Sequence, residues 1–399
     1  MTRLSLVIAT ILLTSVCSAY SQPTAKTADT TGLGHINFTV SAAPEWSDLL
    51  KRQNGWFGGD GIYTIPLNGV EGKAARANDK VLIIFSDSMI GTITNNTMQP
   101  GYKMIHNSVA ILDGGKPVEK NINFYWDKDK TGAAESIFWP KTPKTEKNDY
   151  YWLGDGFVNQ ALNNSVYIFG YRVRNVSDGA FGFKEVGNTL IKIPNWSKPP
   201  YAGQSQMDTP FYLTDEAGES GSFGAGVFVN TKAAGEKNAD GYIYVYGVRG
   251  MAKKLMVARV LPKDFEYFEK WSYYDGANWS SNINKAADVT DHLSNELSLT
   301  TLPDGRYALV FQVDGMSPTV GMRIGKTPYG PFGPIIKLWD CKPDLEEKTY
   351  LVYNAKAHPS LSQPGELLIS YNINSLEFIK DLGKNPNLYR PRFIRVKFQ

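Results

Sequence analysis

A unit of two strands joined by a turn recurs five times along this chain, and the repeat constrains the fold more than any other feature. In each copy, a strand led by glycine or polar residues precedes a turn and a strand of apolar and aromatic residues. The equivalent positions at the starts of the first strands are Asp60, Asp155, Ala225, Glu296 and His358. Repeats of roughly 60 to 95 residues fit propeller blades with decorated loops. The repeat therefore predicts a single five-bladed β-propeller with antiparallel blades.

Composition supports an all-β chain. Aromatic residues make up 13% of the 399 residues, which also include 37 Gly and 22 Pro. Such a mixture of β-favouring and turn-forming residues is typical of all-β domains. Further strands are expected over residues 104–112, 184–193, 255–260 and 320–324, and the best candidate for a short helix covers residues 43–51. We expect one domain over residues 35–399, in which residues 35–40 and 393–398 complete the last blade.

The first twenty residues have the features of a secretory signal peptide. Arg3 precedes an apolar run over residues 4–13, and small residues follow as far as Ala19. The run is too short to cross a bilayer, so no transmembrane segment is expected. We predict a signal peptide over residues 1–20, a flexible leader over residues 21–34, and a secreted or periplasmic protein. A surface lipoprotein attached through Cys17 is the alternative, although the bulky Val16 stands before that cysteine.

Charge and reactive side chains exclude several classes of partner. The net charge is only +3, without a block of Lys and Arg, so nucleic acid is not expected to bind. Once the signal peptide is removed, Cys341 has no second cysteine to pair with. A lone His358 does not make a metal site, and we expect neither a metal nor a cofactor. The expected state is a monomer whose partner is a polysaccharide or oligosaccharide substrate.

Two carboxylates at the ends of neighbouring strands are the first candidates for chemistry. Asp60 stands among glycines just before the strand over residues 62–67, and Asp87 follows the apolar strand over residues 81–85. In an antiparallel pair, these two ends lie at the same rim of the sheet. Paired acids at such a rim are a recurrent arrangement for cleaving glycosidic bonds. The alternative is that Asp60 only makes a bend and Asp87 only ends a strand.

The repeat adds further acids to the same predicted pocket. Asp155 and Glu296 occupy positions equivalent to Asp60, so three blades contribute an acid to one mouth of the channel. We favour Asp60 and Asp87 as the working pair, with the other two as supporting acids, but Glu296 could instead be the general acid. Aromatic residues next to these positions could stack on sugar rings or simply pack the blades: Trp56, Phe57, Trp152 and Tyr353.

Several motifs resemble the DUF4185 family of five-bladed propeller glycoside hydrolases, which includes the endo-D-arabinanases of glycoside hydrolase family 183. The similar segments are residues 60–63, 85–87, 298–311, 320–323, 328–332 and 353–359, so the resemblance spans roughly residues 55–372. The last segment adds Asn354, Lys356 and His358 as substrate-binding candidates. Two features depart from the family pattern: the loop over residues 67–80 is longer, and Ser86 replaces the usual glycine.

The resemblance implies a secreted glycoside hydrolase that acts on a polysaccharide of the arabinan type. Because loops around a propeller mouth set specificity, the sugar itself stays open, and an L-arabinan or a fructan is also possible. A non-catalytic glycan-binding or surface-scaffold propeller is the alternative from a different class. Such a protein would keep the aromatic residues and would not need a close pair of acids.

Overall fold

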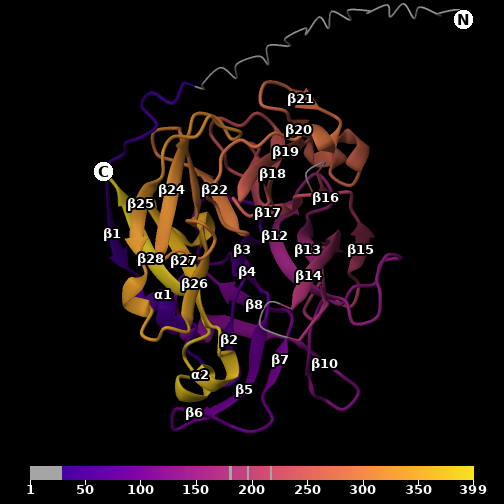
Figure 1. The fold of residues 1–399 in the computed structure, drawn as a ribbon, viewed down its shortest axis with the longest axis vertical. Coiled ribbons are helices and arrows are strands. Elements are labelled where there is room, and N and C mark those ends of the chain that lie inside the picture. Colours follow the sequence, from indigo (N-terminus) through magenta and orange to yellow (C-terminus); the bar gives the residue numbers. More distant parts are fainter. Residues whose placement is uncertain (1–28, 179–181, 196, 216–217) are drawn as a thin grey trace, which may run out of the picture.

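The protein is built almost entirely of antiparallel β-strands (Figure 1). A computed structural model describes residues 29–178, 182–195, 197–215 and 218–399, so the predicted signal peptide and most of the leader lie outside the described residues. The all-β fold class predicted from the sequence is confirmed. Within the described ranges, no helix combines the length and apolar character that crossing a membrane requires.

Five sheets of four or six strands make up most of the fold. In spatial order, the first contains β3 (Tyr63–Pro66), β4 (Lys80–Phe85), β8 (Ser108–Asp113) and β9 (Ile122–Tyr125). The second contains β12 (Tyr150–Asn159), β13 (Ser165–Asn175), β14 (Phe183–Ile193) and β15 (Ser205–Asp208). The third contains β16 (Tyr212–Thr214), β17 (Ser220–Asn230), β18 (Tyr242–Arg249), β19 (Lys254–Val260), β20 (Ser272–Tyr274) and β21 (Trp279–Ser280).

The remaining two large sheets come from the C-terminal part of the chain and one early strand. The fourth contains β22 (Leu297–Thr301), β23 (Tyr307–Gln312), β24 (Thr319–Gly325) and β25 (Ile336–Asp340). The fifth contains β26 (Tyr350–Ala357), β27 (Glu366–Ser375), β28 (Arg392–Phe398) and β1 (Phe38–Ala42). The strands expected over residues 184–193, 255–260 and 320–324 are thus confirmed within one residue. The single strand expected over residues 104–112 is wrong, because the chain breaks there into β7 (Lys103–Ile105) and β8 (Ser108–Asp113), which belong to different sheets.

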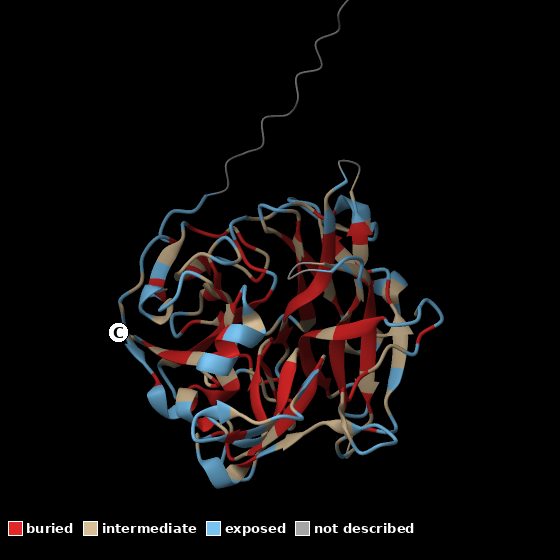
Figure 2. Cartoon of the chain, turned by 60° about the horizontal axis from the view of Figure 1, so that its bottom comes forward, coloured by how far each residue is buried: buried red, intermediate tan, exposed pale blue. Residues whose placement is uncertain are grey.

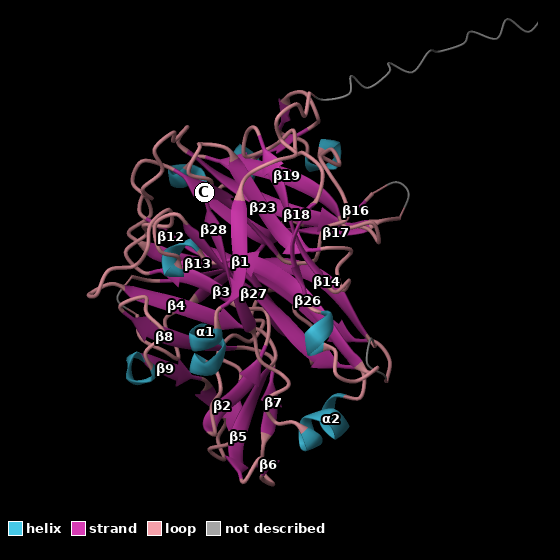
Figure 3. Cartoon of the chain, turned by 90° about the vertical axis from the view of Figure 1, so that its left-hand side faces the viewer, coloured by secondary structure: helices cyan, strands magenta, loops and turns pink. Residues whose placement is uncertain are grey.

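Smaller elements decorate these sheets. A satellite sheet contains β2 (Asn54–Gly59), β5 (Ser88–Thr94), β6 (Thr97–Met98) and β7 (Lys103–Ile105), and β10 (Asp127–Lys128) pairs with β11 (Ala134–Glu135). Helix α1 (Pro44–Leu49) confirms the short helix expected there, whereas α2 (Phe378–Lys384) was not predicted. The 3-10 helices span Glu119–Asn121, Pro262–Asp264, Phe268–Lys270, Ile283–Lys285, Lys342–Asp344 and Pro359–Leu361. Figure 3 shows the satellite sheet and α2 together at one end of the molecule.

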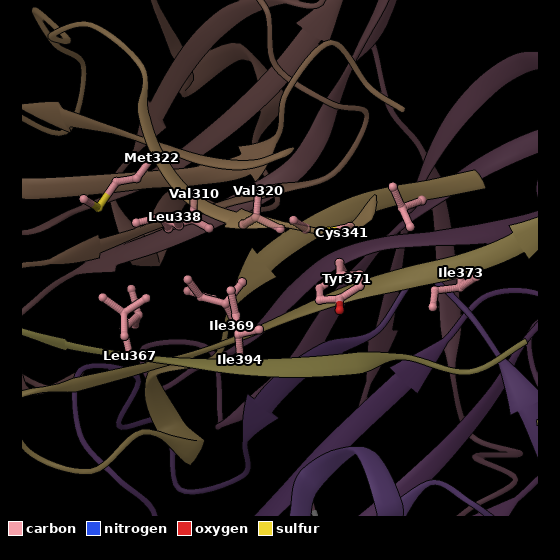
Figure 4. Close-up of a cluster of buried hydrophobic side chains, with 14 of the residues drawn as sticks. Val310, Val320, Met322, Leu338, Cys341, Leu367, Ile369, Tyr371, Ile373 and Ile394 are labelled. Carbon is pink, nitrogen blue, oxygen red and sulfur yellow. The ribbon is translucent and has the colours of Figure 1, made fainter. Parts of the chain in front are cut away.

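The five large sheets pack face to face in sequence, with an apolar cluster between each neighbouring pair. The clusters join the first and second sheets, the second and third, the third and fourth, the fourth and fifth, and the fifth and first. Figure 4 shows one of them, in which Val310 and Met322 of the fourth sheet face Ile369 and Ile394 of the fifth. Burial is concentrated in the strands, and exposed residues lie mainly in the surrounding loops (Figure 2).

One strand of each large sheet lies beside the corresponding strands of its neighbours. β12 contacts β3 on one side and β17 on the other, and β22 contacts both β17 and β26. The 3-10 helix Pro359–Leu361, which follows β26, contacts β3. These five strands therefore surround a common axis.

The fifth sheet joins the two ends of the described chain. β1 pairs with β28 in antiparallel register, from Phe38 opposite Phe398 to Ala42 opposite Ile394. This confirms the expected closing pair. Leu33, in the described part of the predicted leader, is 4% exposed and belongs to the apolar cluster between the fourth and fifth sheets.

Strand boundaries differ from the prediction in a systematic way. β12, β17 and β26 start before the equivalent positions, and each contains a bulge, at residues 153–156, 223–226 and 353–356 respectively. An extra residue in a strand redirects side chains locally. In the fifth repeat, the bulge contains Asn354 and Ala355, so His358 was assigned to the equivalent position wrongly. His358 follows the end of β26 instead.

The packing between the fourth and fifth sheets should dominate stability. Ile394 is fully buried in this cluster, whereas Ile379 on α2 is 47% exposed. We expect Ile394→Ala to lower the free energy of unfolding by about 2–5 kcal/mol because it removes buried methyl groups and leaves a cavity. Ile379→Ala, the matched control, should change it by less than about 0.5 kcal/mol. Urea denaturation checks both values, and equal losses would contradict the assigned packing.

Candidate functional site

Asp60 and Asp87 lie side by side at one end of the first sheet. The backbone N–H of Asp60 donates to the carbonyl oxygen of Asp87 at 3.2 Å, and the N–H of Ser86 donates to the carbonyl oxygen of Asp60 at 2.9 Å. The prediction that these two acids share a rim is therefore confirmed. The neighbouring glycines have backbone roles: Gly58 packs against the backbone of Tyr389, and Gly61 has a φ of +60°.

Asp60 is held by two tyrosines in a desolvated position. The Tyr353 hydroxyl donates to Oδ2 of Asp60 at 2.5 Å, and the nearby Tyr389 hydroxyl donates to the carbonyl oxygen of Asp87 at 3.3 Å. Burial, followed by repulsion from the Asp87 carboxylate, raises the pKa of Asp60 to about 8. Asp60 is therefore protonated at neutral pH and able to give up a proton.

Asp87 has a different environment although its backbone is bonded to that of Asp60. Its Oδ1 is 3.1 Å from Nδ1 of His106 and accepts a hydrogen bond from Nε1 of Trp152 at 3.2 Å. The Asp87 side chain is 20% exposed and that of His106 is 26% exposed. Asp87 therefore faces solvent next to an aromatic side chain, an arrangement suited to contact with a ligand.

Asp155 lies deeper along the axis, inside the bulge of β12. Its two carboxylate oxygens accept backbone N–H groups, from Gly156 at 2.8 Å and from Val227 on β17 at 2.7 Å. Burial raises the pKa of Asp155 to about 7, although these hydrogen bonds and the charge of Lys356 act in the opposite direction. Asp155 therefore ties the second sheet to the third and contributes a carboxyl group below Asp60.

Glu296 forms a buried ion pair with Lys356. The ammonium group of Lys356 contacts Oε2 of Glu296, and Nδ2 of Asn354 donates to Oε1 at 2.7 Å. Lys356 is 0% exposed, and its Nζ lies 4.5 Å from the centre of the Tyr63 ring. Burial raises the pKa of Glu296, while the charge of Lys356 opposes the shift. Because Glu296 is already occupied by two partners, it suits a supporting role better than that of the general acid.

The loop over residues 67–80 crosses the opposite end of the axis. The Gly72 N–H donates to Ala234 after β17, the Ala75 N–H donates to Ser360, and Nε2 of Gln160 after β12 donates to Gly69. These contacts tie the loop to three other sheets. This end of the axis holds a small pocket lined by Glu71, Asp155 and Glu236 among others, and the side chains of Asp87 and His106 are partly exposed at the other end.

Several predicted site residues are not available to a substrate. Trp56 and Phe57 are each 1% exposed, and Trp56 stacks on Phe124 with 4.7 Å between ring centres, so both are core residues. His358 is also 1% exposed, and Thr64 and Ser370 occupy its two ring nitrogens. Burial lowers the pKa of His358 to about 3, so it is neutral. The assignment of substrate contacts to these three residues was wrong.

The other predicted residues gather at the site in different ways. Trp152 and Tyr353 contact the acids directly and are partly exposed. Asn354 and Lys356 act on Glu296 from the bulge of β26, and Lys356 is too deeply buried to touch a ligand at the mouth. In the described part of the chain, no group of three His, Cys, Asp or Glu side chains is arranged to hold a metal ion.

Sequence reasoning missed two residues that contact the acids. His106 lies between β7 and β8, and Tyr389 lies in the segment before β28. Both contact Asp87 from segments that connect other strands, and neither belongs to the repeated unit. A strand-end histidine so close in sequence to Asp87 was the one available signal for His106.

Together, the fold and site define an all-β protein with carboxyl groups clustered at one end of an axis surrounded by sheets. The family described as "Domain of unknown function (DUF5005)" matches residues 44–398, and the chain belongs to this family. The membership in DUF4185 suggested by the motifs is not shown. A search of the curated proteins gave no match.

Solved structures with similar folds include a candidate hydrolase from Bacteroides ovatus. It is 23% identical, with 90% of each chain covered and a TM-score of 0.67. An exo-β-1,3-galactanase from Phanerochaete chrysosporium is 9% identical, with 82% of this chain and 60% of that chain covered and a TM-score of 0.45. A GH62 hydrolase in complex with xylotriose is 10% identical, with 84% and 96% covered and a TM-score of 0.43.

The raised pKa of Asp60 predicts a specific dependence of stability on pH. The folded protein holds this proton more tightly than the unfolded chain, whose Asp has a pKa near 3.8. The contribution is complete below pH 4 and is lost as the pH rises to about 8, with a slope of at most about 1.4 kcal/mol per unit. The stability of the wild type relative to Asp60→Asn should therefore fall across this range. A flat difference in urea denaturation would contradict the assignment.

The buried ion pair predicts strong coupling between its partners. Lys356→Met leaves the Glu296 carboxylate without its cation in a desolvated site, so we expect a loss of about 3–5 kcal/mol in the free energy of unfolding. Adding Glu296→Gln should recover part of this loss because the uncompensated charge is removed. Denaturation of the two single variants and the double variant measures the coupling, and purely additive losses would argue against a working ion pair.

Proposed function

We propose that this protein is a glycoside hydrolase that cleaves a polysaccharide or oligosaccharide at the open end of a five-bladed β-propeller. The five large sheets are the proposed blades, and the paired strands β1 and β28 complete the last one. The observation that carries the proposal is the pair Asp60 and Asp87, two adjacent acids in contrasting environments. Such pairs perform the two roles that glycoside hydrolysis requires.

Asp60 has the properties of the general acid. Because its pKa is raised to about 8, it carries a proton at neutral pH that can pass to the leaving glycosidic oxygen. The hydrogen bond from Tyr353 holds the carboxyl group in place while the proton moves. As this proton is transferred, the bond between the anomeric carbon and that oxygen breaks, the oxygen leaves with the electron pair as a hydroxyl group, and a carboxylate or a water bonds to the anomeric carbon.

Asp87 has the properties of the second carboxylate. Its Oδ1 is held by Trp152 and His106, while no residue in the described ranges donates to Oδ2. Oδ2 is therefore free either to attack the anomeric carbon or to remove a proton from an attacking water. Asp155 and Glu296, held by backbone N–H groups and by Lys356 respectively, are the supporting acids of this proposal.

We also propose a class of substrate and a location for this protein. The motif resemblance supports an arabinan-type glycan, and the N-terminal sequence supports export. The Bacteroides ovatus protein of similar fold is described as a candidate hydrolase, but fold alone does not define a reaction, and the proposal for this chain rests on the two acids.

Removal of either acid tests the proposal. Release of reducing ends should be measured on a panel that includes D- and L-arabinan, xylan, β-1,3-galactan and a fructan. Asp60→Asn and Asp87→Asn should each reduce kcat by at least about a hundredfold on the best substrate, because each removes a proton-transfer or nucleophilic group. The control Asp113→Asn alters a side chain that is 44% exposed and should retain full activity.

Two outcomes would overturn the proposal. Full activity in Asp87→Asn would remove this residue from the reaction. Glycan binding without hydrolysis of any panel member would favour a binding protein instead. If hydrolysis occurs, the configuration of the first product, followed by proton NMR, separates retention, which needs carboxyl groups about 5 Å apart, from inversion, which needs about 6.5–9.5 Å.

A further inference from the structure

His106 is the one histidine placed against the paired acids. It lies in the short segment between β7 and β8, where its backbone N–H donates to Oγ of the buried Ser136 at 2.9 Å. Its Nδ1 is 3.1 Å from Oδ1 of Asp87. The segment and the side chain are thus fixed at separate points.

Aromatic contacts fix the plane of the imidazole ring. The ring stacks on Tyr150 with 3.8 Å between ring centres and 16° between planes. Trp139 approaches the ring edge-on, at 6.2 Å and 90°. Because Tyr150 is only 5% exposed while the His106 side chain is 26% exposed, the imidazole covers the tyrosine and presents its other face and edge outward.

The two ring nitrogens of His106 differ in their partners. The indole N–H of Trp152 donates to Oδ1 of Asp87, and Nδ1 of His106 is hydrogen-bonded to the same oxygen. No residue in the described part of the chain is hydrogen-bonded to Nε2.

We propose that His106 is a substrate-contacting residue whose Nε2 is hydrogen-bonded to a hydroxyl group of a neutral sugar bound beside Trp152. This inference rests on the proposed function and specifies its substrate class. The acidic group bonded to His106 is the carboxyl group of Asp87, and Lys356 is fully buried and already paired with Glu296. The carboxylate of an acidic sugar would therefore be placed against another carboxyl group at this wall.

The chemistry of asparagine separates substrate contact from positioning of Asp87. In His106→Asn, the side-chain amide takes the place of Nδ1 and can still donate to Asp87, but nothing replaces Nε2. His106→Ala removes both functions. If His106 only orients Asp87, the asparagine variant should behave like the wild type. If it contacts the sugar, both variants should lose affinity.

Binding should be measured in the Asp60→Asn background, so that substrate is not consumed. The probes are short neutral oligosaccharides, namely arabino-oligosaccharides, xylotriose and β-1,3-galactotriose, with trigalacturonic acid as the acidic probe. We expect the best neutral probe to bind about tenfold more weakly to His106→Asn, as the loss of one hydrogen bond implies. The acidic probe should bind more weakly than the neutral ones to every variant.

Imidazole NMR signals provide a readout that is independent of turnover. The chain has four histidines, and His35 is exposed near the opposite end of the fourth sheet, where its carbonyl oxygen accepts a bond from Arg306. Saturation with the neutral probe should shift the Cε1–H signal of His106, assigned through the His106→Asn variant, and leave that of His35 unchanged. His35→Asn is the matched control and should bind normally.

The outcomes separate this inference from the proposed function. Hydrolysis of a neutral glycan without a shift of the His106 signal, or with normal binding by His106→Asn, would overturn the inference alone. Binding and a His106 shift without hydrolysis in the wild type would overturn the proposed reaction alone. If no probe binds, or if trigalacturonic acid binds best, the inferred neutral-sugar contact is wrong.

Discussion

Apolar packing between successive sheets is the constraint on which the rest of this structure depends. Five clusters join the five large sheets in order, and the last of them joins the fifth sheet back to the first. Packing of this kind fixes the neighbours of each sheet. It also brings β3, β12, β17, β22 and β26 to a common axis. The polar groups on those strands must then satisfy one another, because water has little access to them.

Several carboxyl groups are buried near the common axis, where the packed sheets hold them in place. Asp60, Asp155 and Glu296 are desolvated, and the pKa of each is raised. Tyrosine hydroxyls, backbone N–H groups and Lys356 compensate these carboxyl groups one by one. Burying several carboxyl groups together is unfavourable, so such an arrangement persists only where the surrounding packing holds it in place. The same rigidity keeps the neighbouring carboxyl groups of Asp60 and Asp87 in unlike surroundings.

The local sequence pattern predicted part of the candidate site. The remaining part depends on contacts between residues that are distant in the sequence. The proximity of Asp60 and Asp87 follows from two adjacent strands, so alternation and turn residues suffice to predict it. The bulges that place Asp155 and Asn354 depend on backbone register between strands, which composition does not encode. The Trp56 side chain is of a type that can stack on a sugar ring, but the structure shows that it packs in the core. His106 reaches Asp87 from outside the repeat, so no periodicity could have identified it.

The pairing of β1 with β28 has a consequence for the order in which the molecule is assembled. Phe38 pairs with Phe398, so the fifth sheet cannot be completed until β28 has been synthesised. The other four large sheets can form while the chain grows, but β1 must wait for a partner that follows all of their strands. Until then, the edges of β1 and β27 are unpaired and open to other strands. The fifth sheet thus has a built-in final step, in which β28 joins β1 to β27.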